Sequence, residues 1–456
     1  MNWNVVIDVV QWLFLLYFAG LQLTYFSLNI IAFVDLLGRR QQRRGEPVHS
    51  VYRGYEPSVS IIMPAYNEQE MILEALKTML NQDYPALQIV IVNDGSKDRT
   101  LDVLKEAFDL VPFEIDPRSN LESKPIRQIF RSRSQADLVV VDKQNGGKAD
   151  ALNAGINFAR HDLVCTIDAD TEFEPDCIRR TVELFMERPE TIAAGGSIMP
   201  MNGSLRDDRG FVVQAGLATN FWARIQTIEY VRAFLFGRLG WVPSNALLVI
   251  SGAFGLFDRK AVVAVGGYRR DTVGEDMELT VRLHRWARDQ KREYRIGFVP
   301  GITCWTEVPE RGFVLQQQRI RWHQGLSECI SIHKGLMFRH GALGWLAMPA
   351  QVFFEWLSPL VEVSGYLFAA IALALGLIDH NAVLAFLILS VGLGILLSVS
   401  SLLLQELVLR AFPRFRDVLV LCGFAVIENV GYRQMHAAWR IIGFFRWFGK
   451  RGYNWH

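Results

Sequence analysis

Apolar segments of membrane length lie in both the first and the last part of the 456-residue chain, and they constrain its fold more than any other feature. From Trp12 to Val34 the sequence is apolar apart from a few uncharged polar residues. A helix needs about 20 such residues to cross a bilayer. Similar stretches occur within residues 342–377 and 382–404. We therefore expect a multi-pass membrane protein.

Basic residues directly after the first apolar segment predict its orientation. Arg39, Arg40, Arg43 and Arg44 follow it, and the positive-inside rule places such a cluster in the cytoplasm. A cleaved signal peptide is disfavoured, because the apolar run is too long and no small-x-small site follows it. The region after this helix is therefore expected to be cytoplasmic, with the helix in the plasma membrane.

The later apolar segments leave the number of spans open. Residues 342–377 are interrupted by prolines and glutamates, which predicts an interfacial helix followed by a span at about Phe353–Leu377. An outside turn at residues 378–381 and a returning span at Ala382–Leu404 would follow. Val418–Val430 is also apolar, but crossing outward there would place the basic tail outside. Three and four spans both remain open.

Between about Leu36 and Ile332 strand-like runs alternate with helical patterns, which favours an α/β fold. Apolar residues at helical spacing between Met71 and Leu80 predict a crossover helix. Val111–Arg133 contains three prolines and is expected to be a mobile, irregular insertion outside the core. The predicted strands are short β-branched runs of the kind buried in parallel sheets, at Val59–Met63, Ile89–Val92, Leu138–Val141 and Leu163–Ile167.

Charge and cysteine content exclude two classes of function. The chain has 48 Lys plus Arg and 47 Asp plus Glu, a net charge of +1, so no strong field attracts nucleic acid. Its five cysteines are scattered without C-x-x-C spacing, which argues against structural zinc and favours small buried side chains in a reduced domain.

Polar residues follow three of the four predicted strands. They occupy residues 66–68, 93–96 and 168–170. Because ligands of open α/β sheets bind beyond the carboxyl ends of the strands, the three segments together predict a binding site. Asp168 and Asp170 offer the hard oxygen ligands that Mg²⁺ or Mn²⁺ prefers, although Asp also favours turns and helix caps by itself.

Two further segments could carry chemistry. Residues 143–150 combine glycines with Lys143 and Lys148, without the spacing of a Walker loop, and could instead form a solvated turn. Glu275 and Asp276 follow Gly274 and open an amphipathic helix. They could cap this helix, or one of them could take a proton from an acceptor hydroxyl.

The pentapeptide Gln318-Arg319-Ile320-Arg321-Trp322 lies where the long polar region meets the later apolar segments. In a helix Gln318, Arg321 and Trp322 would share one face. Arg can bind a diphosphate and Trp can stack on a sugar ring. The alternative is an interfacial helix that Arg and Trp anchor at the bilayer surface, and both can hold together.

Three carboxylate sites, then a Gln-x-x-Arg-Trp box, then membrane segments: this order resembles the processive family 2 glycosyltransferases, such as the cellulose, hyaluronan, chitin and poly-N-acetylglucosamine synthases. The resemblance covers about Val59–Trp322 and the flanking spans. It implies a GT-A-type α/β fold, with a mixed, mainly parallel sheet, helices on both faces, and added transmembrane and interfacial helices. It also implies inverting, metal-dependent transfer from a nucleotide-diphosphate sugar, chiefly a UDP-sugar, to a growing β-linked polysaccharide that passes through the membrane.

The resemblance also implies roles for individual residues. Asp276 would be the catalytic base, and Asp168 with Asp170 would hold Mg²⁺ or Mn²⁺. Arg321 would bind the leaving diphosphate, with Gln318 and Trp322 acting beside it. Donor-binding residues would be Ala65, Tyr66, Glu68, Asp94, Lys148 and Asp168. Acceptor-binding residues would be Ser251, Gly252, Glu275 and Trp322.

The resulting domain prediction has three parts: an N-terminal transmembrane helix (1–37), a cytoplasmic glycosyltransferase domain (38–335), and interfacial and transmembrane helices with a basic tail (336–456). The expected partners are a nucleotide-sugar donor, a polysaccharide or lipid acceptor, the bilayer, and a small accessory membrane subunit or export proteins. Two alternatives remain: addition of one sugar to a lipid, and a degenerate transferase that acts as a membrane receptor or scaffold. The sequence does not reveal the sugar; N-acetylglucosamine and glucose are the leading candidates.

Overall fold

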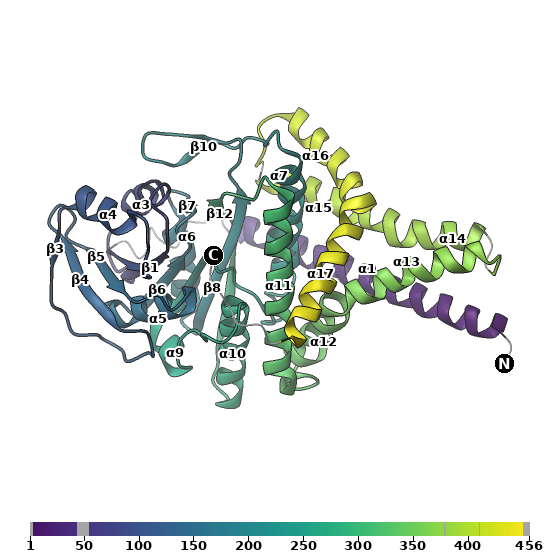
Figure 1. Cartoon of the computed structure of the whole chain (residues 1–456), viewed down its shortest axis with the longest axis horizontal. Helices are drawn as coiled ribbons and strands as arrows, with labels where there is room; N and C mark the ends of the chain where they lie inside the picture. Colours follow the sequence, from purple (N-terminus) through teal and green to yellow (C-terminus); the bar gives the residue numbers. More distant parts are fainter. Residues whose placement is uncertain (1–2, 43–53, 378–379, 410, 450–456) are drawn as a thin grey trace. The chain divides into compact units, whose positions relative to one another are not determined.

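The computed structural model describes residues 3–42, 54–377, 380–409 and 411–449, and divides the chain into two compact units (Figure 1). The helical unit comprises Met1–Leu37, Leu217–Ser244 and Pro309–Gly452. The sheet unit comprises Gly38–Gly216, Asn245–Val308 and Tyr453–His456. Residues 217–244 and 309–335, which the domain prediction places in one continuous catalytic domain, thus group with the helices.

The sheet unit is built on a 10-stranded mixed sheet with the order β3-β4-β5-β2-β1-β6-β11-β8-β12-β7. Its centre, β5-β2-β1-β6, is parallel, and β8 and β12 form a second parallel pair. All four predicted strands are confirmed, as β1 (Val59–Ala65), β2 (Leu87–Asn93), β5 (Leu138–Lys143) and β6 (Leu163–Ile167). The remaining strands of the sheet are β3 (Leu110–Pro112), β4 (Ile126–Ser132), β7 (Thr171–Phe173), β8 (Thr191–Pro200), β11 (Phe254–Asp258) and β12 (Arg295–Thr306), and a separate hairpin consists of β9 (Leu205–Arg206) and β10 (Val212–Gln214).

Helices pack on this sheet through closely fitting apolar faces. The predicted crossover helix is α3 (Ile72–Leu80). At Gly155 of α5 a methyl group would collide with Ile62, so glycine allows this helix to lie close to β1. The other helices of the unit are α4 (Thr100–Phe108), α6 (Cys177–Glu187), α9 (Arg259–Ala264) and α10 (Glu275–Asp289), and α5 spans Lys148–Phe158.

The prediction that 111–133 is an irregular insertion outside the core is wrong. Leu110–Pro112 form β3 and Ile126–Ser132 form β4, and these strands extend the sheet antiparallel beside β5. Pro112 is tolerated because β3 is the edge strand, where a missing N–H breaks no further ladder. In β4 the exposed Arg131 lies between the buried Phe130 and Ser132, a half-buried pattern that the flanking prolines obscured.

The helical unit contains two helices that are long and apolar enough to cross a membrane, Val5–Gly38 and Ile388–Leu407, within the described residues. A third candidate is the pair Leu343–Trp356 and Ser358–Ala374, if the two count as one span despite a bend of 45°. The span predicted at 353–377 is therefore interrupted at Leu357. Large apolar side chains on the first helix are exposed, including Trp12, Leu16, Leu23 and Ile30.

The other predicted membrane features are only partly covered by the described residues. Of the predicted turn, 378–379 lie outside the described residues, while His380 and Asn381 begin α14. The segment at 418–430 falls mainly in α16 and is not among the candidate spans. Arg43, Arg44, Arg410 and most of the basic tail from 450 lie outside the described residues.

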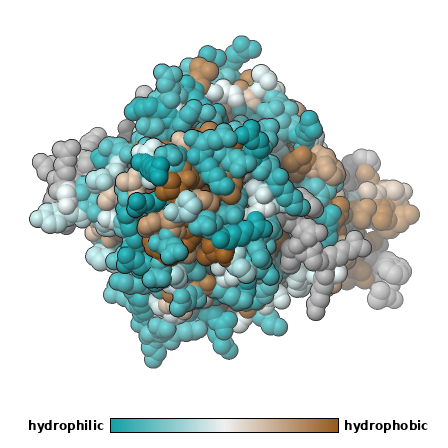
Figure 2. All heavy atoms as spheres, turned by 60° about the vertical axis from the view of Figure 1, so that its left-hand side comes forward, coloured by the Kyte–Doolittle hydropathy of each residue, from teal (hydrophilic) through white to brown (hydrophobic). Residues whose placement is uncertain are grey.

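The helices of this unit are α1 (Trp3–Gln42), α7 (Phe221–Tyr230), η1 (Val231–Phe236), α8 (Gly237–Leu239), α11 (Gly312–His333), η2 (Lys334–Leu336), η3 (Leu343–Ala347), α12 (Met348–Ala350), η4 (Gln351–Trp356), α13 (Ser358–Ala374), α14 (His380–Leu387), η5 (Ile388–Gly392), α15 (Leu393–Leu409), α16 (Phe415–Ile427), η6 (Glu428–Tyr432) and α17 (Arg433–Phe448). The face of the sheet unit that is turned forward in Figure 2 is mainly hydrophilic, with apolar side chains gathered near its centre.

All five cysteines are free, and four of them are buried, as expected for small apolar side chains.

Candidate active site

The loops after β1 and β2 are joined by hydrogen bonds at the carboxyl ends of these parallel strands. The Asn67 N–H donates to Ser96 Oγ at 3.0 Å, and the Glu68 N–H donates to Thr100 Oγ1 at 2.8 Å. Asn67 adopts a left-handed conformation, with φ of 58°, and its side-chain oxygen accepts from the Lys97 N–H. The loop with the predicted donor residues Tyr66 and Glu68 is thus fixed against the loop after β2.

Asp94 is buried beneath these loops rather than presented at the surface. Its side chain is 2% exposed. The carboxylate accepts from Lys143 Nζ at 2.5 Å, from the Gly146 N–H at 3.0 Å and from the Gly147 N–H at 2.8 Å. Asp94 therefore shapes the glycine loop that leads into α5. The base contact implied by the resemblance stays a prediction.

Lys148 is the first residue of α5 and lies among carboxylates. Its ammonium group forms an ion pair with Asp168, lies 3.7 Å from Glu275 Oε1, and donates to the Gly252 carbonyl at 3.4 Å. Burial by itself would lower the pKa of Lys148, but the carboxylates of Asp168, Glu275 and Asp276 outweigh it and raise the pKa above its ordinary value. The site therefore keeps a fixed positive charge.

Asp276 lies at the start of α10 with both carboxylate oxygens bound by backbone amides. Oδ2 accepts from the Gly252 N–H at 2.8 Å and Oδ1 from the Met277 N–H at 2.7 Å. A methyl group at Gly252 would crowd the Lys148 ammonium group, so this lysine would have to shift. The helix N-terminus favours a negative charge at this position. Asp276 is thus held in one orientation beside Lys148.

The neighbouring predicted acceptor residues lie in the same cluster. Burial raises the pKa of Glu275 to about 7, with Lys148 opposing the shift and Asp276 adding to it. Ser251 precedes Gly252, and its hydroxyl accepts from the Ala253 N–H at 3.4 Å. The structure therefore brings Lys148, Asp168, Gly252, Glu275 and Asp276 together.

Glu68, Asp168 and Asp170 concentrate negative charge beyond the end of β6. Burial raises the pKa of Asp170 to about 6, and the Asp168 carboxylate adds to this shift. Burial also raises the pKa of Glu68 to about 7, followed by the effect of Asp170 and then Asp168. No group of three or more His, Cys, Asp or Glu is placed to hold a metal among the described residues. The aspartate pair nevertheless fits a divalent cation that completes its shell with water and phosphate.

The Gln-x-x-Arg-Trp box belongs to the helical unit and is helical, within α11. Gln318 is half-buried, while Arg321 and Trp322 are exposed; Arg319 and Ile320 are buried. The residues predicted to act chemically thus occupy the more accessible side of the helix. Their roles stay predictions.

Arg319 has a structural role that the sequence analysis missed. It is 5% exposed and donates from Nη2 to Glu229 Oε2 at 2.7 Å. Glu229 also accepts from the Tyr432 hydroxyl at 3.2 Å. The guanidinium group lies 4.2 Å from the centre of the Trp322 ring, a cation–π contact. Nothing in the sequence signals these partners, because they come from distant helices.

Comparison with known proteins identifies the class to which this fold and site belong. Residues 60–238 match the family described as glycosyl transferase family 2, and residues 163–400 match glycosyl transferase family group 2. The chain belongs to the family 2 glycosyltransferases.

Curated relatives include poly-beta-1,6-N-acetyl-D-glucosamine synthases of Staphylococcus. The Staphylococcus aureus (strain COL) protein is 32% identical over 273 residues, which cover 60% of this chain and 55% of the relative. The Staphylococcus epidermidis protein is 30% identical over 273 residues, with the same coverage. The chain thus spans about half the length of the curated relatives it matches.

A solved mannosyltransferase from Pyrobaculum calidifontis, in complex with GDP-Man and Mn²⁺, has the same fold. Its TM-score is 0.54 at 16% identity, covering 96% of this chain and 100% of that one. The predicted GT-A-type fold is confirmed.

Proposed function

We propose that this protein transfers sugar from a nucleotide-diphosphate sugar to a growing β-linked polysaccharide, with inversion at the anomeric carbon. One observation carries the proposal. Lys148 is ion-paired with Asp168 and lies near Glu275, while Gly252 binds both Lys148 and Asp276. A cation for a leaving diphosphate and a fixed carboxylate for an acceptor hydroxyl are thus held on one scaffold. This is the pair of groups that inverting transfer needs.

In the proposed reaction Asp276 accepts the proton of the acceptor hydroxyl while the oxygen of that hydroxyl forms a bond to C1 of the donor sugar. The bond from C1 to the diphosphate oxygen breaks at the same time, and the electron pair leaves with the nucleotide diphosphate. Positioned proton transfer of this kind contributes roughly 10²–10⁴-fold to rate. The two backbone amides on Asp276 keep its carboxylate aimed at one position.

Lys148 is proposed to stabilise the negative charge that develops on the diphosphate. Its raised pKa keeps it protonated over the range in which enzymes work. Asp168 and Asp170 would hold Mg²⁺ or Mn²⁺, which neutralises diphosphate charge when bound. The Mn²⁺ and GDP-Man of the solved mannosyltransferase are consistent with a metal-bound nucleotide donor.

Polymer synthesis and passage through the membrane are supported by two features. The curated relatives are poly-beta-1,6-N-acetyl-D-glucosamine synthases, which favours N-acetylglucosamine as the sugar and UDP as its carrier. The chain also has candidate membrane spans on both sides of the sheet unit in the sequence. We place the sheet unit on the cytoplasmic side of the plasma membrane, where nucleotide sugars occur.

The test uses the full chain in detergent or nanodiscs with Mg²⁺ or Mn²⁺ and a panel of nucleotide sugars. Release of nucleotide diphosphate identifies the donor, and product length identifies the mode of addition. We expect UDP release from UDP-N-acetylglucosamine and a ladder of polymer lengths. Asp276→Asn should lower transfer at least about 100-fold while nucleotide binding persists. Near-wild-type activity in this variant would refute the assignment of the base.

Single addition to a lipid is the second candidate, because the same residues can serve any acceptor hydroxyl. A product that carries one sugar on an extracted lipid would favour it. A receptor or scaffold role is disfavoured by the intact cluster around Lys148, since buried carboxylates with raised pKa values are costly to retain. Binding of a nucleotide sugar without any turnover would favour that role.

A further inference from the structure

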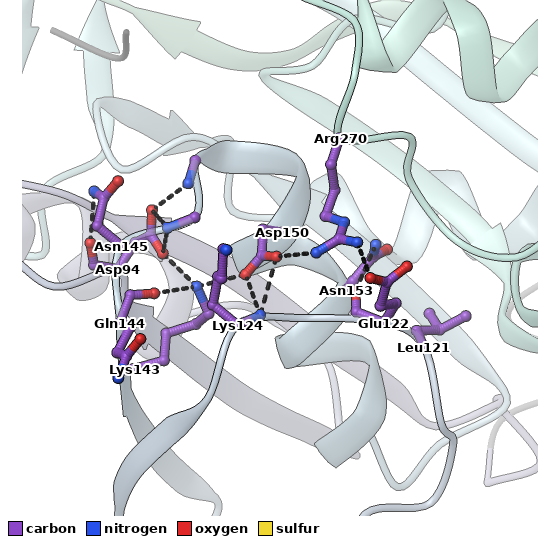
Figure 3. Close-up of polar contacts among 12 residues, drawn as sticks. Asp94, Leu121, Glu122, Lys124, Lys143, Gln144, Asn145, Asp150, Asn153 and Arg270 are labelled. Carbon is purple, nitrogen blue, oxygen red and sulfur yellow. Dashed lines mark hydrogen bonds and ion pairs between the residues drawn. The ribbon is translucent and has the colours of Figure 1, made fainter. Parts of the chain in front are cut away.

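A second charged cluster lies within the sheet unit, next to the site but unused by the proposed chemistry (Figure 3). Lys143 is fully buried, with Nζ 2.5 Å from Asp94 Oδ1 and 2.6 Å from Asp150 Oδ1. Asp150 is also fully buried, and it accepts from the Lys124 N–H at 2.9 Å and from Arg270 Nη1 at 3.1 Å. Arg270 forms a further ion pair with Glu122.

Arg270 belongs to the segment 265–274, which joins α9 to α10 and which we call the strap. The strap is tied to α10 through Arg282, which donates to the Gly267 carbonyl at 2.6 Å. It is tied to α5 through Asn153, whose side chain accepts from the Tyr268 N–H at 2.7 Å and donates to the Tyr268 carbonyl at 2.9 Å. These bonds fix the first half of the strap.

The Tyr268 hydroxyl also lies 3.0 Å from Thr166 Oγ1 in β6, the strand that Asp168 follows. The strap therefore contacts the three elements that carry the site. Helix α5 begins with Lys148, β6 leads to Asp168, and α10 begins with Glu275. A displacement of the strap would change the distance between the lysine and the carboxylates.

We propose that Arg270 is a positioning residue: its ion pair with Asp150 sets Glu275 and Asp276 at the correct distance from Lys148. The inference rests on the proposed function for its kinetic consequence, but its structural consequence is independent. Asp150 lies in the first turn of the helix that begins with Lys148, and Arg270 lies in the second half of the strap, shortly before α10. The pair thus links the helix that begins with Lys148 to the strap that precedes Glu275 and Asp276.

Arg270 both attaches the strap and compensates charge. Lys143 pairs with Asp150, and the Lys124 N–H donates to it, but Lys143 also pairs with Asp94. Removal of Arg270 therefore leaves one lysine for two buried carboxylates, and it also detaches the second half of the strap from α5. Arg270→Lys keeps the positive charge and so separates the two effects. Substitution of the fully buried Lys143 or Asp150 would disturb the cluster further, so Arg270 is the better position for a test.

The neighbouring Arg269 provides a matched control. It pairs with Asp271 at 2.6 Å within the strap itself, and both side chains are exposed. The Arg269→Ala variant removes the same type of side chain one position earlier and leaves the ion pair with Asp150 of α5 intact.

The experiment compares Arg270→Ala, Arg270→Lys and Arg269→Ala in the full chain. Amide hydrogen exchange across residues 268–277, affinity for the nucleotide diphosphate, and steady-state kinetics with the donor are measured. For Arg270→Ala we expect faster exchange in this segment and a kcat lowered roughly 10- to 100-fold, since small misplacements of reacting groups are costly. KM and nucleotide affinity should stay within about twofold, because Lys148 and the loops after β1 and β2 are unchanged.

Arg270→Lys should recover part of both losses, and Arg269→Ala should resemble the wild type. The inference would be overturned if Arg270→Ala showed the amide exchange rates of the wild type. It would also be overturned if Arg269→Ala lost as much kcat as Arg270→Ala, or if nucleotide affinity in Arg270→Ala fell as much as kcat. If the wild type turns over no nucleotide sugar, the proposed function fails, and the exchange and nucleotide-binding measurements still decide whether Arg270 holds the strap.

Discussion

The two units of the molecule both bury charged side chains, but they arrange them differently. In the sheet unit Lys143 is enclosed by two carboxylates, and backbone amides bind the same carboxylates. In the helical unit carboxylates with little exposure each pair with one arginine from another helical segment: Glu229 with Arg319, Glu428 with Arg232, and Glu362 with Arg433.

The difference indicates two uses of the same interaction. Around Lys143 the buried charges organise backbone loops, since four separate segments converge on them. In the helical unit each pair joins two helical segments, although the segment of Glu428 is broken at Val430 and Gly431. There the pairs can only fix how one helix lies against another. A buried pair contributes little net stability but makes the wrong arrangement costly.

The largest expected effect comes from removing the enclosed cation. Lys143→Met leaves Asp94 and Asp150 facing each other in the interior and should lower the free energy of unfolding of the sheet unit by roughly 3–5 kcal/mol. This free energy is measured by denaturant unfolding in detergent, with hydrogen exchange in β2 and β5 as the probe of the sheet unit. Lys260→Met, at a side chain that is 74% exposed, is the control. A loss below about 1 kcal/mol would show that the cluster does not depend on its cation.

A somewhat smaller loss is expected for Arg319→Met in the helical unit. Glu229 keeps the Tyr432 hydroxyl as a donor, so the loss should lie near the lower end of the range for a broken buried pair, about 3 kcal/mol. Faster exchange should be confined to α7 and α11. The double variant Arg319→Met with Glu229→Gln should recover part of the loss. If hydrogen exchange in the sheet unit became faster to the same extent, the proposed difference between the two units would be wrong.

Metal addition should stabilise the sheet unit alone, in a pH-dependent way. The pKa of Glu68 is raised to about 7 and that of Asp170 to about 6. The folded state therefore binds more protons than the unfolded state from about pH 4 to 7, and stability without metal falls as pH rises through this window. Mn²⁺ competes with these protons, so its effect on Tm should be larger at pH 8 than at pH 5.5.

At a metal concentration of a hundred times Kd the stabilisation should be about 2.7 kcal/mol. Thermal unfolding with and without Mn²⁺ measures it. The double variant Asp168→Asn with Asp170→Asn should show no metal-dependent shift. A shift of the same size in that variant would place the metal elsewhere.

The smallest effect on stability is expected at Arg321. Its exposed side chain should change the free energy of unfolding by less than about 0.5 kcal/mol when replaced by Ala, in contrast to its neighbour Arg319. Turnover should nevertheless fall, because the box is proposed to act on the leaving diphosphate. Unfolding and turnover of the same preparation separate the two arginines. A stability loss as large as that of Arg319→Met would contradict the division of the helix into a packed and an active side.

The sequence predicts the centre of the fold well for a physical reason. Strands β1, β2, β5 and β6 are buried apart from Leu87, so the predicted runs within them are apolar. The residues that follow them must be polar if a ligand binds there. Helix α10 is likewise signalled by the acidic residues at its start and its apolar spacing.

What could not be predicted depends on contacts between distant segments. Lys143 stands before two glycines and resembles a solvated turn, yet its partners enclose it completely. Glu229 and Arg319 are 90 residues apart, and neither is marked by its neighbours in sequence. The segment 217–244 is too short and too mixed in polar and apolar residues to be recognised as part of the helical unit, although the structure groups it there.

The interleaving of the two units has a consequence for how the protein is made. The chain contributes to the helical unit, then to the sheet unit, and returns to each again. During synthesis the first candidate membrane span emerges before any strand, and the sheet unit cannot be completed until 217–244 have been made. The helical unit is finished last. No single contiguous fragment contains the whole catalytic sheet without also carrying α7, whose packing partners on α16 are made much later. Separation of the sheet unit from the helical unit would therefore require a circular permutation or a designed linker rather than a truncation.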